Sequence, residues 1–226
     1  MNQERVASIG SSLFKRVALW TLCFIGAAAA VRRIVALLIP ATSPRVQQMA
    51  ELDAQFSRRA GLTLAHIVPA LIFVVLLPAW FSVRVWENAP AHRRLTWVLL
   101  VLGAVIGLTA LPLVTQPVGG TTEVTAILFF DGLFLFSLAR AWVLFVRGDM
   151  DRYREWMMRA VAVLLGIATT RPVMGVFFAT SRLTHLEPHQ FFGIAFWIGF
   201  SVTYVAGEIY LQRNSVHSKA LAQSRG

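Results

Sequence analysis

Long apolar segments constrain this chain more than any other feature. In hydrocarbon each backbone N–H and C=O must find its partner inside the segment, so about 20 apolar residues cross a bilayer as a helix. Hydrophobic residues make up 57% of the 226 and charged residues only 14%. We therefore predict an all-α fold, a polytopic membrane bundle of about six transmembrane helices, near residues 17–39, 62–83, 95–115, 122–146, 157–179 and 190–211.

The first apolar segment is the weakest of the six, because Arg32 and Arg33 interrupt it. Its beginning also has the pattern of a signal peptide, in which Lys15 and Arg16 precede "VALWTLCFIG" and then "AAAA". We favour an uncleaved anchor, because "IVALLIP" continues the apolar stretch. The predicted organisation is a cytoplasmic segment over 1–16, a transmembrane domain over 17–212 and a cytoplasmic tail over 213–226.

The distribution of Lys and Arg predicts the orientation of the helices. Cytoplasmic loops carry an excess of these residues. The two short turns "TQPVGGTTE" and "TSRLTHLEPHQ" contain a single basic residue, Arg182, so we assign them to the outer side. Both termini are therefore predicted to be cytoplasmic. Contact with anionic lipid then accounts for the net charge of +10 without a nucleic-acid partner, while a homo-oligomer or another membrane partner stays open. The inner segments then contain Arg5, Lys15, Arg16, Arg84, Arg93, Arg94, Arg147, Arg152, Arg154, Arg213, Lys219 and Arg225.

Several large side chains fall at the expected cytoplasmic ends of these helices. Amphipathic rings favour the headgroup region, so tryptophans at these ends are predicted to be interfacial anchors. Arg159 comes just after a cytoplasmic boundary, and its long side chain can extend to the headgroups. The predicted anchors are Trp80, Trp86, Trp97 and Trp156.

Four stretches of the chain carry a family resemblance. "AHRRLTW", "RYREWMMRAVAVLLGIATTR", His66 in "LTLAHIVPALIFVVLLPAWF" and Glu208 in "YVAGEIYLQ" together resemble bacterial predicted membrane proteins grouped as domain of unknown function 2306. The likeness covers about residues 60 to 212, although Tyr153 stands where that family usually has histidine. The resemblance implies a helical fold in the bacterial inner (cytoplasmic) membrane and no particular reaction. The other family-like polar positions are His92, Arg93, Arg154 and Arg159.

Two charges fall deep inside the apolar segments, Asp131 and Arg171. Arg171 lies twelve residues beyond Arg159, about 18 Å along a helix, which is too deep for its side chain to reach the headgroups. Asp131 falls at a similar depth on the preceding helix, and pairing removes the penalty of an isolated charge. We predict a buried ion pair between them, which either locks two helices together or lines a polar cavity or proton path.

The histidines suggest a second site, on the outer face. His66 begins the second segment, while His185 and His189 lie in the outer turn and at the start of the sixth. One imidazole from each of two helices can ligate a haem iron, and neutral imidazoles also suit copper or zinc. A b-type haem between His66 and His189, walled by Phe191, Phe192 and Trp197, is one hypothesis. Hydrogen bonding within the bundle, or a metal or proton-relay site with Glu123 and Glu187, are others.

The sequence gives no support for standard soluble enzyme chemistry. The chain has no Gly-rich phosphate loop, H-E-x-x-H, G-x-S-x-G or CxxC pattern. Its single cysteine, Cys23, is expected to be an apolar packing residue. His92 belongs to the inner side and cannot join the outer histidines. Two classes of function stay open, a cofactor-binding redox membrane protein and a small transporter or structural membrane subunit.

Overall fold

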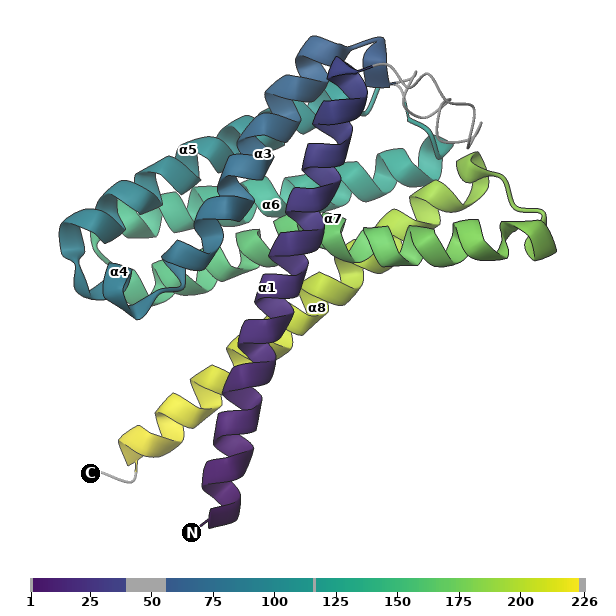
Figure 1. Cartoon of the computed structure of the whole chain (residues 1–226). Helices are drawn as coiled ribbons and strands as arrows, with labels where there is room; N and C mark the ends of the chain where they lie inside the picture. Colours follow the sequence, from purple (N-terminus) through teal and green to yellow (C-terminus); the bar gives the residue numbers. More distant parts are fainter. Residues whose placement is uncertain (1, 40–55, 116, 224–226) are drawn as a thin grey trace. The chain divides into compact units, whose positions relative to one another are not determined.

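The computed structural model describes residues 2–39, 56–115 and 117–223, and all of its regular structure is helical (Figure 1). No strand occurs in these ranges, which confirms the predicted all-α fold. The helices are α1 (Asn2–Leu38), α3 (Ala60–Trp80), α4 (Val83–Glu87), α5 (Ala89–Leu113), α6 (Gly120–Arg147), α7 (Met150–Thr184) and α8 (Pro188–Gln223).

Six of these helices are long and apolar enough to cross a membrane, as the apolar segments predicted. Each of the six spans is longer than 20 residues, which covers the hydrocarbon thickness of a bilayer. The protein is therefore a multi-pass membrane protein. The spans are Arg16–Leu38, Ala60–Trp80, Ala89–Leu113, Gly120–Arg147, Met150–Ser181 and Pro188–Asn214.

Several helices extend beyond the apolar segments. α1 begins at Asn2, and α8 continues to Gln223, so helix covers much of both segments predicted to be cytoplasmic. The short helix α4 was not predicted at all. Hydrophobicity marks the lipid boundary, whereas charged residues such as Arg, Lys and Glu are good helix formers in water. Helix ends and membrane boundaries therefore differ.

The turn between α6 and α7 explains why α7 begins before its apolar segment. Gly148 ends α6 with a φ of 76°, a left-handed conformation that glycine adopts at little cost. Asp149 then begins α7, and its side chain accepts a hydrogen bond of 3.2 Å from the N–H of Arg152. The charged stretch after Met150 is thus already helical, several residues before the apolar segment begins.

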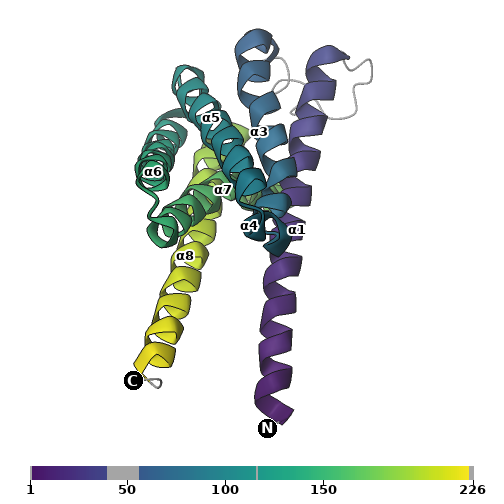
Figure 2. The ribbon, with the colours of Figure 1, turned by 90° about the vertical axis from the view of Figure 1, so that its left-hand side faces the viewer.

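The chain divides into two compact units, Met1–Leu102 and Gly103–Gly226. In the first unit α1 and α3 lie side by side (Figures 1 and 2). Arg33 of α1 is only 8% exposed, and its guanidinium lies 4.0 Å from the ring centre of Phe56. A cation over an aromatic face is stabilised electrostatically, so the packing of Phe56 explains how this apolar span accommodates an arginine.

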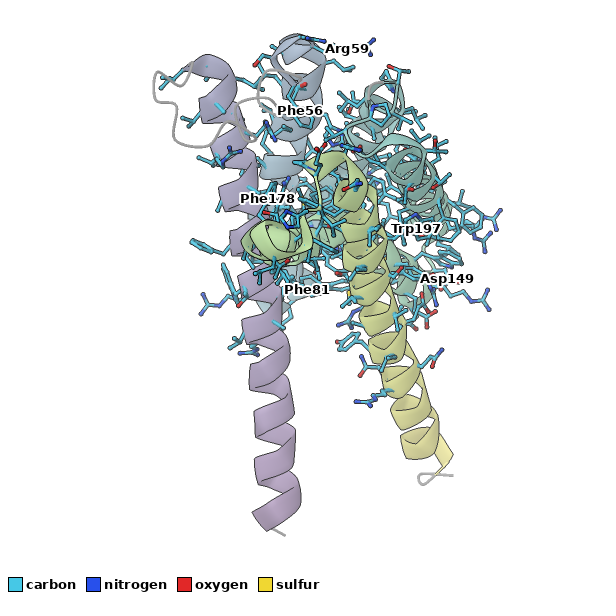
Figure 3. All side chains as sticks on the ribbon, turned by 90° about the vertical axis from the view of Figure 1, so that its right-hand side faces the viewer. Phe56, Arg59, Phe81, Asp149, Phe178 and Trp197 are labelled. Carbon is cyan, nitrogen blue, oxygen red and sulfur yellow. The ribbon has the colours of Figure 1, made fainter. Side chains whose placement is uncertain are left out.

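In the second unit α7 packs against both α6 and α8. Half of the α7 span is buried, the largest share of any span, so α7 is the central helix of this unit. Aromatic rings fill the contacts around it. Trp197 of α8, labelled in Figure 3, packs on Phe130 of α6 at 5.4 Å between ring centres. Phe191 stacks on Phe177 at 5.1 Å.

Small residues bring α7 and α8 into close contact. A Cβ atom added at Gly199 would lie 2.6 Å from the backbone nitrogen of Thr170, and one at Gly207 would lie 2.7 Å from Cβ of Ala162. In lipid, helices associate through such close backbone packing and through hydrogen bonds between them. Thr169 and Thr203 supply such a bond, with 2.6 Å between their hydroxyl oxygens. These contacts hold α7 and α8 in one register.

Candidate functional site

Asp131 is the most unusual polar residue of the second unit. It lies in the middle of α6, is 9% exposed, and its Oδ2 atom is buried with no hydrogen-bond partner among the described residues. An ionisable side chain inside a membrane span is costly and commonly marks an ion or substrate pathway. Asp131 is therefore the leading candidate for a functional group.

The carboxyl of Asp131 faces Gly107 on α5. A Cβ atom added at Gly107 would lie 3.3 Å from Asp131 Oδ1 and 2.8 Å from Cγ of Leu135. Only glycine leaves the carboxyl and the leucine in their present positions. The site thus consists of a carboxyl on α6 and a backbone surface on α5.

The predicted ion pair between Asp131 and Arg171 stays a prediction, although the Oδ2 atom of Asp131 has no hydrogen-bond partner among the described residues. The two lie on consecutive packed helices, as expected, and Arg171 is partly buried. Successive residues of a helix are rotated by about 100°, so a matching depth does not make two side chains face each other. The Oδ1 atom of Asp131 lies close to Gly107 of α5.

Arg159 of α7 and Glu208 of α8 form an ion pair. The Nε and Nη2 atoms of Arg159 donate to the two carboxylate oxygens of Glu208 at 2.7 and 3.3 Å. Their side chains are 21% and 24% exposed, so the pair is largely shielded from solvent. The prediction placed both among the polar positions but expected Arg159 to extend to the headgroups.

Aromatic side chains surround this ion pair. The guanidinium of Arg159 lies 4.7 Å from the ring of Trp156, which also contacts Arg140 of α6 at 5.6 Å. Tyr204, one helical turn before Glu208, places its hydroxyl as a hydrogen-bond partner of the Glu208 carboxylate. Both oxygens of the carboxylate and one face of the guanidinium are thus engaged. This cluster connects α6, α7 and α8.

Glu123, the second buried acid of this unit, has a structural role. It is 5% exposed in the first turn of α6, and its Oε2 accepts a 2.7 Å hydrogen bond from the N–H of Gly119. The N–H of Val118 also donates to this carboxylate. Orphan N–H groups at the start of a helix need such acceptors. Glu123 therefore caps its own helix.

The outer histidines fall in different parts of the structure. His66 lies on α3 in the first unit, and His189 lies on α8 in the second. Nδ1 of His189 is 3.2 Å from Oε2 of Glu187, with 63% and 69% of these side chains exposed. His185 ends α7 with a φ of 54°. No group of three or more potential metal ligands occurs among the described residues. The haem pair His66 and His189 stays a prediction.

The aromatic residues expected to wall a haem take part in helix packing. Phe191 is fully buried against Phe177 and Phe178 on α7, and Phe192 is 4% exposed. Trp197 contacts Phe130 of α6. These rings form the core of the second unit, where they hold α8 against its neighbours.

His92 belongs to an aromatic cluster in the first unit. It is 7% exposed, and its ring lies 4.2 Å from that of Trp86, whose Nε1 donates a 2.6 Å hydrogen bond to the carbonyl of Trp80. Trp80 itself is completely buried, so the prediction that it anchors in the headgroups is wrong. Its neighbours Trp86 and Phe81 cover it.

The remaining polar positions lie on the surface. Arg93 and Arg154 are exposed, whereas Cys23 is 5% exposed, in keeping with a packing role. The sequence reasoning missed two neighbours of these acids. Gly107 lies beside Asp131, and Tyr204 lies beside Glu208. The spacing of Tyr204 and Glu208, four residues apart on one helix face, was a signal that could have revealed the second of these.

No protein-family model, curated protein or solved structure matches this chain. The class of the protein therefore follows from its own architecture, which is that of a multi-pass helical membrane protein with a buried carboxyl in its second unit.

Proposed function

We propose that this protein is a small proton-linked membrane transport protein in which Asp131 takes up and releases the proton. The observation that supports this proposal is the Oδ2 atom of Asp131, buried within a membrane span without a hydrogen-bond partner among the described residues. The resemblance to domain of unknown function 2306 fits a protein of the bacterial inner membrane. It implies no competing reaction.

The environment of Asp131 suits a group that changes its charge. An unpaired carboxylate is costly in a medium of low dielectric constant, whereas a protonated carboxyl there needs only one hydrogen-bond acceptor. Gain or loss of the proton therefore changes which surroundings the side chain tolerates. Proton-linked transport requires such a coupling between charge and conformation.

Gly107 gives this carboxyl a partner surface without a side chain. Because its backbone approaches Asp131 closely, a small movement of α5 against α6 would open a space beside the carboxyl. Water or a polar substrate can then reach the carboxyl of Asp131 and accept its proton. Close glycine contacts are a common feature of packed transmembrane helices.

Infrared difference spectroscopy on the protein in lipid vesicles tests the protonation of Asp131. Stepping the pH should produce a carbonyl band of a protonated carboxylic acid that disappears in Asp131→Asn and shifts in Asp131→Glu. The matched control is Asp151→Asn, because Asp151 is an exposed acid in the first turn of α7. A titrating band that is the same in Asp131→Asn and in the control contradicts the proposal.

The haem hypothesis has a separate and simple test. If His66 and His189 hold a b-type haem, protein purified from a haem-replete host should show a Soret band that both His66→Ala and His189→Ala abolish. A spectrum without this band removes the redox function and leaves the proton-linked proposal unaffected.

A further inference from the structure

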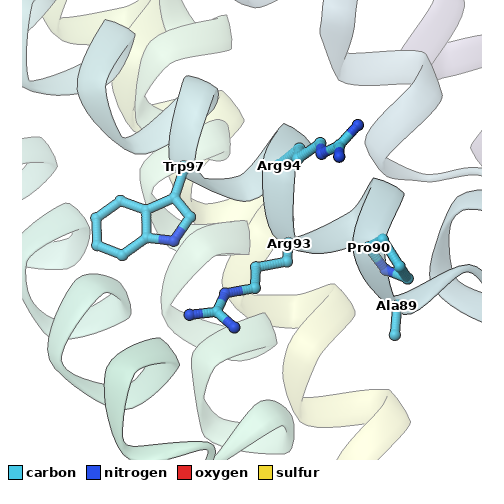
Figure 4. A pocket seen from close by; sticks show the side chains of 5 residues that line it. All are labelled: Ala89, Pro90, Arg93, Arg94 and Trp97. Carbon is cyan, nitrogen blue, oxygen red and sulfur yellow. The ribbon is translucent and has the colours of Figure 1, made fainter.

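A shallow cavity lies against the beginning of α5 (Figure 4). Its volume is about 440 Å³, and it is lined by Ala89, Pro90, Arg93, Arg94 and Trp97. Pro90, Arg93 and Arg94, and Trp97 recur at spacings of three and four residues, so they form one stripe along the helix. The cavity thus combines two cations with an aromatic surface.

Neither arginine of this cavity is engaged elsewhere. Arg93 and Arg94 are exposed, and neither makes an ion pair or hydrogen bond with another residue in the part of the chain that the structure describes. Glu87, the preceding acid in the sequence, is exposed and pairs with neither of them. Two positive charges on adjacent residues repel each other, and a bound anion would relieve that repulsion.

The backbone adds to this positive potential. Asn88 caps α5 by accepting a 3.1 Å hydrogen bond from the N–H of Ala91, and the cavity lies on the turns that follow. The beginning of a helix carries a partial positive charge. The start of α5 and the two arginines therefore both attract an anion.

The shape of the site favours an anion attached to an apolar or neutral group. Figure 4 shows Arg93 and Trp97 directed to the same side of the helix, with Arg94 directed away from them. An anion at Arg93 would leave the neutral part of its ligand against the Trp97 ring. Arg94 would reach the anion by a change of rotamer, which no ion pair opposes.

We propose that this cavity binds the phosphate of a phosphate ester, with the headgroup of an anionic phospholipid as its membrane source. Guanidinium groups match phosphate oxygens in geometry and charge, and basic pockets at the ends of membrane helices suit lipid headgroups. α5 is a membrane-spanning candidate that begins at Ala89, so the cavity lies at the end of a span. The site is separate from Asp131 and independent of the proton-linked function.

Native mass spectrometry of the detergent-purified full chain tests this proposal. Phosphatidylglycerol, phosphatidylcholine and soluble glycerol phosphate are titrated in parallel. We expect phosphatidylglycerol to bind, and the Arg93→Gln/Arg94→Gln variant to bind it at least about fivefold more weakly, since each interfacial arginine contributes attraction of that order. Preferential binding of phosphatidylglycerol assigns the lipid headgroup. Equal competition by glycerol phosphate assigns a soluble phosphate ester.

The matched control is Arg147→Gln/Arg213→Gln, which removes the same charge from two other exposed arginines. Elution of both variants as monodisperse peaks verifies that they fold. If both variants lose phosphatidylglycerol binding equally, the loss follows from net charge alone, and the proposal is overturned. Unchanged binding in Arg93→Gln/Arg94→Gln, or the absence of binding by both phosphate compounds, would also overturn it.

Discussion

Replacing Glu208 by Gln removes the charge that neutralises Arg159 while keeping the size of the side chain. The two groups share hydrogen bonds of 2.7 and 3.3 Å across the interface of α7 and α8. Removing one partner of a fully buried pair costs about 3–5 kcal/mol, whereas exposed pairs contribute roughly 0–1 kcal/mol. Because these side chains are 21% and 24% exposed, we expect Glu208→Gln to lower the free energy of unfolding by about 2 kcal/mol.

A double-mutant cycle separates the ion pair from other effects of the substitution. Arg159→Met keeps part of the packing against Trp156 and also leaves Glu208 without its cation. If the two side chains stabilise each other, the double variant should be more stable than the sum of the single losses predicts, by about 1–2 kcal/mol. The measurement is reversible unfolding in mixed micelles.

Arg152→Met is the matched control for this cycle. Arg152 is 74% exposed, and its contact with Asp149 is 3.7 Å long, so its loss should change the free energy of unfolding by less than about 0.5 kcal/mol. A coupling energy near zero between Arg159 and Glu208 would refute the reasoning. It would mean that solvent or lipid headgroups screen the pair as fully as they screen Arg152.

Three further predictions concern packing, capping and topology. Gly199→Val should destabilise the protein by about 1–3 kcal/mol, measured by the same unfolding assay, because its side chain overlaps the backbone of Thr170; an unchanged stability would show that α7 and α8 can separate. Glu123→Ala should cost about 1 kcal/mol, and hydrogen exchange at Gly119 should rise, since the N–H of Gly119 loses its acceptor. A reporter active only in the periplasm should be inactive when fused to the C-terminus, and activity there would reject the cytoplasmic orientation.

The spans of this protein are predictable because lipid imposes one strong requirement on the sequence. A backbone in hydrocarbon must satisfy all of its hydrogen bonds locally, so apolar length alone identified the six spans. Outside the hydrocarbon that requirement weakens. The start of α7 depends on Gly148 and Asp149, a left-handed helix end followed by a side-chain cap, and hydrophobicity carries no information about either.

The charged residues show where sequence reasoning ends. Counting residues from a membrane boundary gives the depth of a side chain, and Asp131 and Arg171 were paired on that basis. Contact also depends on the direction in which each side chain points, and each residue added to a helix turns that direction by about 100°. In this protein, small residues influence which side chains come into contact. Gly107 lets α5 approach Asp131, while Gly199 and Gly207 bring α8 close to α7, where Glu208 reaches Arg159. The glycines that let helices approach each other therefore help to decide which charges can meet.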